Sequence, residues 1–253
     1  MKKKGVIAAL GGIVFIVSFL FIYWFYFSKP ALFPGNAQLM KDINHLFPEA
    51  SVKKIQDTYN LDERHVFVPF ITSENQYGFS CWEWKKNKWK LVAINSIGEP
   101  SLWRINKKDP STYRFIWNMP PNDNLSSIQF YLIKDRNYHV TEGIGNYEPK
   151  IQMNKEISLL GKPYGVLKLP NDWVSVMDSI KNIESGKKPD LFFSSLFSNP
   201  SIYFGWIPYN QKGKEANLNN ILNGNGFSSS SGDIENLLIL TEEEIEFTQE
   251  LSP

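Results

Sequence analysis

The residue types that most often carry chemistry are few in this chain and lie far apart. Its three histidines, His45, His65 and His139, have no second ligand at metal-binding spacing beside any of them. His139 and Glu142 could share one side of an irregular strand, but a structural zinc site needs four ligands and a catalytic site three. The sequence therefore predicts no metal site.

Nucleophiles and phosphate-binding loops also lack their usual context. The single cysteine, Cys81, has no obvious histidine partner and excludes an internal disulfide, and no Gly-x-Ser-x-Gly elbow occurs. Residues 143–145 and 224–226 read Gly-Ile-Gly and Gly-Asn-Gly, without the Lys-Ser/Thr that follows a phosphate loop. We interpret both as turns. No nucleophile, nucleotide site or cofactor is predicted.

Paired carboxylates are the hardest enzyme chemistry to exclude, because a glycosidase needs only two acids about 5 to 9.5 Å apart. Each conceivable member has a structural interpretation. Glu83 would be a cross-strand partner, Asp109 and Asp135 would form turns, Glu142 would lie on a strand surface and Asp172 would start a helix. The sequence therefore predicts no catalytic residue. A carboxylate hydrolase is kept as an alternative.

The unusual chemistry of the chain is aromatic, since five tryptophans fall within 36 residues: Trp82, Trp84, Trp89, Trp103 and Trp117. A hairpin over residues 81–92 with Lys86 and Asn87 at its tip would pair Trp84 with Trp89, Glu83 with Lys90 and Trp82 with Leu91. The other face, with Cys81, Glu83 and Lys85, should meet water, so the tryptophans lie either in the core or on an exposed platform. Trp84, beside the tip, should stay partly exposed even if Trp82 is buried. We hypothesise that Trp84 and Trp89 form the edge of a binding surface.

The elements that position these residues follow an apolar N-terminal segment. Residues 5–27 carry no charge, and 23 helical residues span about 35 Å, enough to cross a hydrocarbon core of roughly 30 Å. Lys2, Lys3 and Lys4 precede the segment, which places the N-terminus in the cytoplasm by the positive-inside rule. The sequence thus predicts one transmembrane helix.

A cleaved signal peptide is the competing interpretation, but it has a shorter apolar core and small residues before its cleavage site. Here the segment ends in aromatic residues, as in an aromatic belt at a membrane surface. We therefore expect a cytoplasmic tail over residues 1–4, an uncleaved anchor over 5–27, a linker over 28–36 and an extracytoplasmic domain over 37–253. Its partner through residues 5–27 would be the lipid bilayer.

The charge of the predicted domain argues against one class of partner. Four of the 27 basic residues stand at or before Lys29 and all 26 acidic residues follow it, so residues 30–253 carry 23 minus 26, or about −3. A nucleic-acid-binding protein needs a basic face. We therefore expect no nucleic-acid partner.

The apolar pattern of the domain predicts an α+β fold, mainly antiparallel sheet with a few helices. Helices are expected over 37–47, capped by Asn36, and from Asn171 to Ser185, ended by Gly186. Short strands fill the region between them. Two further hairpins are expected, one over 102–117 that places Trp103 and Phe115 on the same face, and one joining 128–133 to 138–141.

The C-terminal part is expected to hold a strand over 201–209, a long mobile loop over 210–232 and a last strand over 234–240. Thr241 and Glu244 form a capping-box pattern that begins a short acidic helix. These features together favour a membrane-anchored envelope protein that binds an envelope polymer or a membrane-protein partner without catalysis. The alternatives are the anchored hydrolase and a single-pass subunit of a membrane complex.

Overall fold

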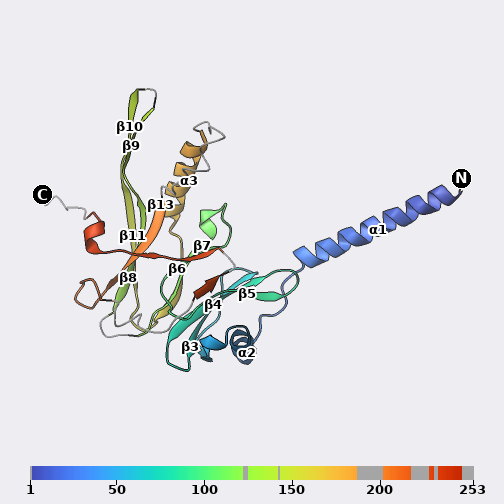
Figure 1. The fold of residues 1–253 in the computed structure, drawn as a ribbon, viewed down its shortest axis with the longest axis horizontal. Coiled ribbons are helices and arrows are strands. Elements are labelled where there is room, and N and C mark those ends of the chain that lie inside the picture. Colours follow the sequence, from blue (N-terminus) through green and yellow to red (C-terminus); the bar gives the residue numbers. More distant parts are fainter. Residues whose placement is uncertain are drawn as a thin grey trace.

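The computed structural model describes residues 2–121, 125–141, 143–186, 202–217, 228–230 and 233–246. These residues form an α+β protein that is mainly antiparallel sheet, with three α-helices (Figure 1). The helices are α1 (Lys2–Phe27), α2 (Asn36–Leu46) and α3 (Asn171–Gly186). Figure 1 shows α1 standing apart from the sheets. Within this part of the chain, no helix is both long and apolar enough to span a membrane.

The two domain helices lie close to their predicted positions. Helix α2 begins one residue earlier than predicted, because Gly35 and not Asn36 is its N-cap, and it ends before Pro48. It buries Leu39 and Ile43. Helix α3 begins at Asn171 as predicted and includes Gly186, one residue beyond its predicted end, and its Trp173 is buried.

The first sheet, sheet A, is a meander beside α2. Its strands run in the order β1-β3-β4-β5-β14, with β2 also paired to β3. Their bounds are β1 (Val52–Ile55), β2 (Tyr59–Asn60), β3 (His65–Thr72), β4 (Tyr77–Trp84), β5 (Trp89–Asn95) and β14 (Ser228–Ser230). A 3-10 turn, η1 (Pro48–Ala50), links α2 to β1.

Two further sheets, B and C, have four strands each. Sheet B has the order β12-β7-β6-β15, with β12 (Tyr164–Lys168), β7 (Tyr113–Asn118), β6 (Ser101–Arg104) and β15 (Ile234–Asn236). Sheet C has the order β11-β8-β13-β16, with β11 (Ile151–Ser158), β8 (Ser127–Lys134), β13 (Ile202–Tyr209) and β16 (Leu238–Ile239). Among the pairs described, β13–β16 is parallel and the others are antiparallel.

The sheets stack in layers, and sheets A and B are covered on both faces. One face of sheet A buries Val66 and Trp82 against α2, and the other buries Phe67 and Cys81 against sheet B. The second face of sheet B packs on sheet C and α3 through one large aromatic core. That core includes Phe115, Trp117, Phe130, Trp173, Phe204 and Trp206.

One C-terminal segment, residues 228–239, supplies an edge strand to sheets A, B and C in turn. Strand β14 pairs with β5 of sheet A, β15 with β6 of sheet B, and β16 with β13 of sheet C. The predicted last strand over 234–240 is therefore two short strands in two sheets, separated by buried Leu237. The predicted loop over 210–232 contains β14, and residues 218–227 and 231–232 of it lie outside the described residues.

The predicted face of Trp103 is wrong. In the β6–β7 hairpin Trp103 pairs with Arg114, and Leu102 with Phe115, so Trp103 shares a face with Ile116. Trp103 consequently packs toward sheet A, whereas Phe115 packs toward sheet C. The 3-10 turn η2 (Pro110–Thr112) lies between the strands, and the loop that contains it sets a register in which odd positions pair with even ones.

The predicted third hairpin is also wrong. Strand β8 pairs with β11, while β9 (Asn137–Thr141) pairs with β10 (Ile144–Glu148). The chain does not reverse at Asp135; it continues outward and reverses after β9. The β9–β10 pairing continues the register of the β8–β11 pairing, because Lys134 pairs with Ile151 and Asn137 pairs with Glu148. Residues 127–158 are thus one long hairpin, which reaches about 45 Å at ~3.3 Å per residue.

Candidate functional site

The candidate functional site is the neck, which we define as residues 28–35 together with the hairpin tip of residues 84–90. Three hydrogen bonds hold the linker to the domain. The Trp89 indole N–H donates to the Ala31 carbonyl at 2.9 Å, and the Ser28 hydroxyl donates to Asn87 Oδ1 at 3.1 Å. Arg64 Nη2 donates to the Ser28 carbonyl at 2.7 Å. The linker therefore lies against the domain.

Aromatic rings cover the same junction. The Phe33 ring packs edge-on against Trp89 at 4.9 Å and against Trp82 at 5.9 Å between centroids. Trp84 lies edge-on to Trp89 at 5.5 Å. Trp84 is only 6% exposed, so the expectation that it stays partly exposed is wrong. Trp89 is half-buried. The binding role of Trp84 and Trp89 stays a prediction, and the linker occupies much of that surface.

The hairpin itself folds as its sequence predicts near the tip. Trp84 pairs with Trp89, Glu83 with Lys90 and Trp82 with Leu91. Lys86 and Asn87 adopt positive φ angles of 54° and 59°, as a two-residue hairpin turn requires.

Further from the tip the predicted pairing fails. A register shift between Cys81 and Trp82 pairs Cys81 with Ala93 and leaves Val92 as the extra residue of a bulge. Cys81 is fully buried, and that burial raises the pKa of its thiol. The face predicted to meet water thus becomes, at Cys81, part of the core between sheets A and B.

A shallow hollow of about 540 Å³ lies beside the neck. It is lined by the linker and by the turn before β3, through residues that include Leu32, Asp62, Glu63 and Trp89. Although partial burial alone would raise the pKa of Asp62, hydrogen bonds from the His65 ring and from the Arg64 backbone N–H lower it. Leu32 is 97% exposed. The hollow therefore combines an apolar wall with a charged carboxylate.

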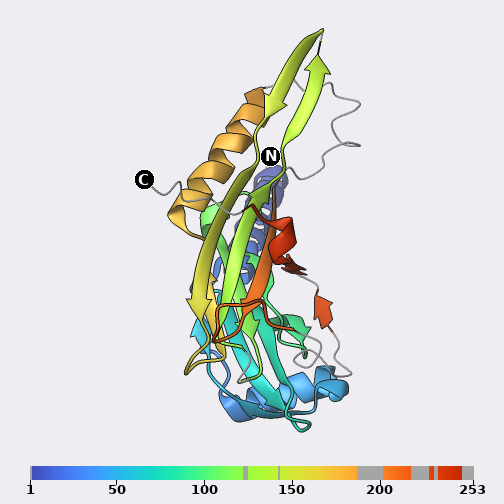
Figure 2. The same cartoon turned by 90° about the vertical axis from the view of Figure 1, so that its left-hand side faces the viewer.

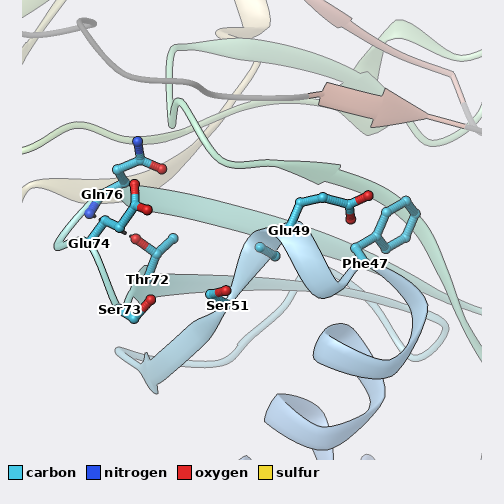
Figure 3. A pocket seen from close by; sticks show the side chains of 8 residues that line it. Phe47, Glu49, Ser51, Thr72, Ser73, Glu74 and Gln76 are labelled. Carbon is cyan, nitrogen blue, oxygen red and sulfur yellow. Dashed lines mark hydrogen bonds between the residues drawn. The ribbon is translucent and has the colours of Figure 1, made fainter.

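A second hollow, of about 580 Å³, lies between η1 and the β3–β4 turn (Figure 3). Its labelled side chains are polar apart from Phe47, with the carboxylates of Glu49 and Glu74 on separate elements (Figure 3). Thr72 and Ser51 take part in local bonds, since Thr72 Oγ1 accepts from the Gln76 backbone N–H and Ser51 Oγ donates to the Pro48 carbonyl. These bonds shape the two turns, and no nucleophile–base pair results from them.

The carboxylates considered in the sequence are not brought together. Glu83 lies 3.6 Å from Lys85 and faces Lys90, while Asp109 caps η2 by accepting from the Ser111 N–H and hydroxyl. Asp135 accepts from the Tyr203 hydroxyl at 3.4 Å. Asp172 lies exposed in the first turn of α3. Glu142 lies outside the described residues. The hydrolase alternative gains no paired site.

Neither histidine with a described side chain lies in a group of three possible metal ligands. His45 is exposed near the end of α2, and the His65 ring lies 2.9 Å from the Asp62 carboxylate. No group of three possible metal ligands occurs among the described residues. Ser51 and Lys54 have a Ser-x-x-Lys spacing that the sequence reasoning missed. Lys54 is an exposed residue of β1 and Ser51 bonds to Pro48, so this spacing forms no reactive pair.

The sequence reasoning also missed the ribbon, which we define as β9 and β10. Figure 2 shows it extending past the end of α3. Tyr138 pairs with Tyr147 and Val140 with Gly145, so the large side chains share one face. Tyr138, Val140 and Tyr147 are 61 to 65% exposed. The Tyr138 ring leans over Gly145, where any Cβ would lie 2.5 Å from its hydroxyl.

The fold and these surfaces together define an α+β protein of layered, mainly antiparallel sheets with a helix at its N-terminus. No protein-family model, no curated protein and no solved structure matches the chain.

Proposed function

We propose that this chain is a single-pass membrane protein whose extracytoplasmic domain binds a protein partner of the envelope without catalysis. The transmembrane assignment of residues 5–27 is part of this proposal. The observation that carries it is the combination, in one chain, of an exposed apolar helix with an exposed aromatic ribbon on the domain.

The exposure of α1 supports anchoring in a bilayer. From Ile13 to Phe21 the large apolar side chains are 58 to 73% exposed, and consecutive residues of a helix point to all of its sides. Such a surface is costly in water and favourable in hydrocarbon. The three N-terminal lysines favour a cytoplasmic N-terminus, which puts the domain on the far side of the membrane.

The ribbon supports binding more than catalysis. A two-stranded hairpin on its own is marginally stable in water, so residues that extend beyond the core need another reason to be there. Apolar patches on a surface mark protein contacts, and aromatic residues are enriched in such contacts. The weighed carboxylates, in contrast, are dispersed over turns, a strand and a helix end. An envelope polymer held at the neck is the second candidate ligand.

Anchoring is tested by protease treatment and alkaline extraction of intact cells. We expect the full chain to stay in the carbonate-insoluble membrane fraction, and protease added outside to digest the domain. A soluble product trimmed at its N-terminus would contradict the anchor. Protection of the domain from external protease would contradict the orientation.

Partner binding is tested by photocrosslinking from position 138 on intact cells. A photoreactive residue there should capture a discrete membrane-associated partner, and Tyr147→Ser should reduce the yield several-fold. Leu160 is 67% exposed at the other end of the long hairpin, so a photoreactive residue at 160 is the matched control. Equal products from both positions would argue against a docking ribbon.

A further inference from the structure

The neck places a group of lysines at the end of α1. Ser28 follows the last helical residue, Phe27, and its hydroxyl donates to Asn87 at 3.1 Å. Asn87 is flanked by Lys86 and Lys88 at the tip of the β4–β5 hairpin. The hairpin tip is therefore fixed beside the point where the helix ends.

The charge of this region is opposite to that of the domain. Lys29, Lys85, Lys86 and Lys88 are exposed. With Lys90 and Arg64 they make six basic residues, against the three acidic residues Asp62, Glu63 and Glu83, or six minus three, +3. Residues 30–253 carry about −3. Glu83 interacts with Lys85 at 3.6 Å, which leaves Lys86 and Lys88 as the outermost positive charges of the hairpin.

Turn formation does not explain the lysine at the tip. Lys86 has a φ of 54°, in the left-handed region that Asn and Gly occupy at lower cost. Asn87, also left-handed, is of the preferred type. A lysine at position 86 thus adds charge at a position where the backbone favours another residue, which points to a role for the charge itself.

We propose that the hairpin tip of residues 85–88 binds the anionic headgroups of the membrane that holds α1. This inference rests on the proposed membrane anchoring. Residues 5–27 are long enough to cover the hydrocarbon core, at about 35 Å against roughly 30 Å, so Phe27 lies at the headgroups. The tip then lies within about one Debye length, ~8 Å, of the lipid headgroups, where anionic headgroups attract its basic side chains.

Lipid contact at the tip would give the domain two attachments to the membrane. The first is α1 and the second is the hairpin, which belongs to the rigid sheet A. Two attachments restrict the tilt of the domain on the surface, and so they set the direction in which the ribbon points.

The test uses the full chain in lipid nanodiscs, either of neutral phosphatidylcholine or with phosphatidylglycerol added. A short pulse of an amine-acetylating reagent, read by mass spectrometry, gives a rate for each lysine. We expect acetylation of Lys86 and Lys88 to slow several-fold with the anionic lipid and to recover at high salt. Lys53, Lys54 and Lys155 are exposed on other strands and serve as internal controls.

Two double variants distinguish lipid binding by the hairpin tip from a general effect of the charge of the domain. Lys86→Gln with Lys88→Gln should remove most of the lipid-dependent protection of Lys85, whereas Lys53→Gln with Lys54→Gln should leave it intact. Equal rates in the two lipids, for a chain that resists carbonate extraction, would overturn the lipid contact and leave the anchor standing. Slow acetylation of the tip lysines in neutral nanodiscs, to the same extent as with anionic lipid, would also overturn it. A chain that carbonate extracts would overturn the anchor instead.

Discussion

At the scale of single residues, the seam between sheets A and B depends on one asparagine and one glycine. Asn118 of β7 is fully buried, and its amide nitrogen lies 2.9 Å from the Phe70 carbonyl and 2.6 Å from the Gly78 carbonyl, both in sheet A. Gly98, which precedes β6, has a φ of +74° and lies close against the backbone of the same asparagine. Buried carbonyls without donors are costly, so these contacts hold the two sheets in place.

Gly98→Ala should therefore be severely destabilising. A Cβ at Gly98 would lie 2.0 Å from the Asn118 carbonyl oxygen and 2.4 Å from that of Tyr77, so the backbone itself must move. Gly161→Ala is the matched control, because Gly161 has a φ of +85° with no atom near its Cβ position. We expect the control to lose about 1 kcal/mol from backbone strain and Gly98→Ala to lose several times more in chemical denaturation. Equal losses would show that the close approach does not matter.

Trp173→Ala should lower the free energy of unfolding by about 3 to 5 kcal/mol, as expected for loss of a fully buried tryptophan. Trp173 is 1% exposed and packs on Phe115 and Phe204, at 6.0 and 6.3 Å between ring centroids. The measurement is the denaturation midpoint in detergent, compared with Leu160→Ala at an exposed position. An unchanged midpoint for Trp173→Ala would contradict the packing.

At the scale of elements, local patterns predicted what local interactions determine. The tip of the β4–β5 hairpin followed from cross-strand partners such as Trp84 and Trp89, and α3 followed from its apolar spacing. The faces of the β6–β7 hairpin did not follow, because the loop between the strands changed the parity of the pairing. Counting positions across a loop is reliable only when its register is known.

The long hairpin shows why the ribbon was missed. Asp135 and Arg136 resemble a turn, yet the strands on both sides of them keep one register with residues 144–158. Pro149 lies opposite this break and cannot donate a ladder hydrogen bond, which explains the interruption without a reversal. The alternation of Tyr138 and Val140, with Tyr147 beyond Gly143, was the available signal.

The neck lay beyond sequence reasoning for a different reason. The contacts of Phe33 with Trp89 and of Ser28 with Asn87 join residues more than 50 positions apart. Residues 28–35 lie between α1 and α2 outside any helix, as Pro30, Pro34 and Gly35 favour. Nothing in its local pattern indicated that the domain would bind it, because that depends on where the hairpin tip lies in the fold.

At the scale of the whole molecule, the domain should fold without α1 but depend on the linker. A chain that begins at Ser28 keeps every neck contact, whereas one that begins at Asn36 loses the Phe33 ring and the Trp89–Ala31 hydrogen bond. We expect the first to unfold cooperatively in aqueous buffer, and the second to be less stable by about 1 to 3 kcal/mol. Thermal and urea unfolding followed by tryptophan fluorescence would measure both. Aggregation of the chain that begins at Ser28 would contradict a domain that folds independently of α1.

The strand order of the C-terminal segment also sets when the protein can finish folding. Residues 228–239 add an edge strand to sheets A, B and C, so one edge of each of the three sheets stays open until this segment has been made. These pairings join residues far apart in sequence, such as Ser229 with Ile94, and distant pairings form slowly. A chain that is synthesised from its N-terminus would therefore stay incompletely folded for most of its synthesis. Its final structure would form only after residues 228–239 had joined the three sheets.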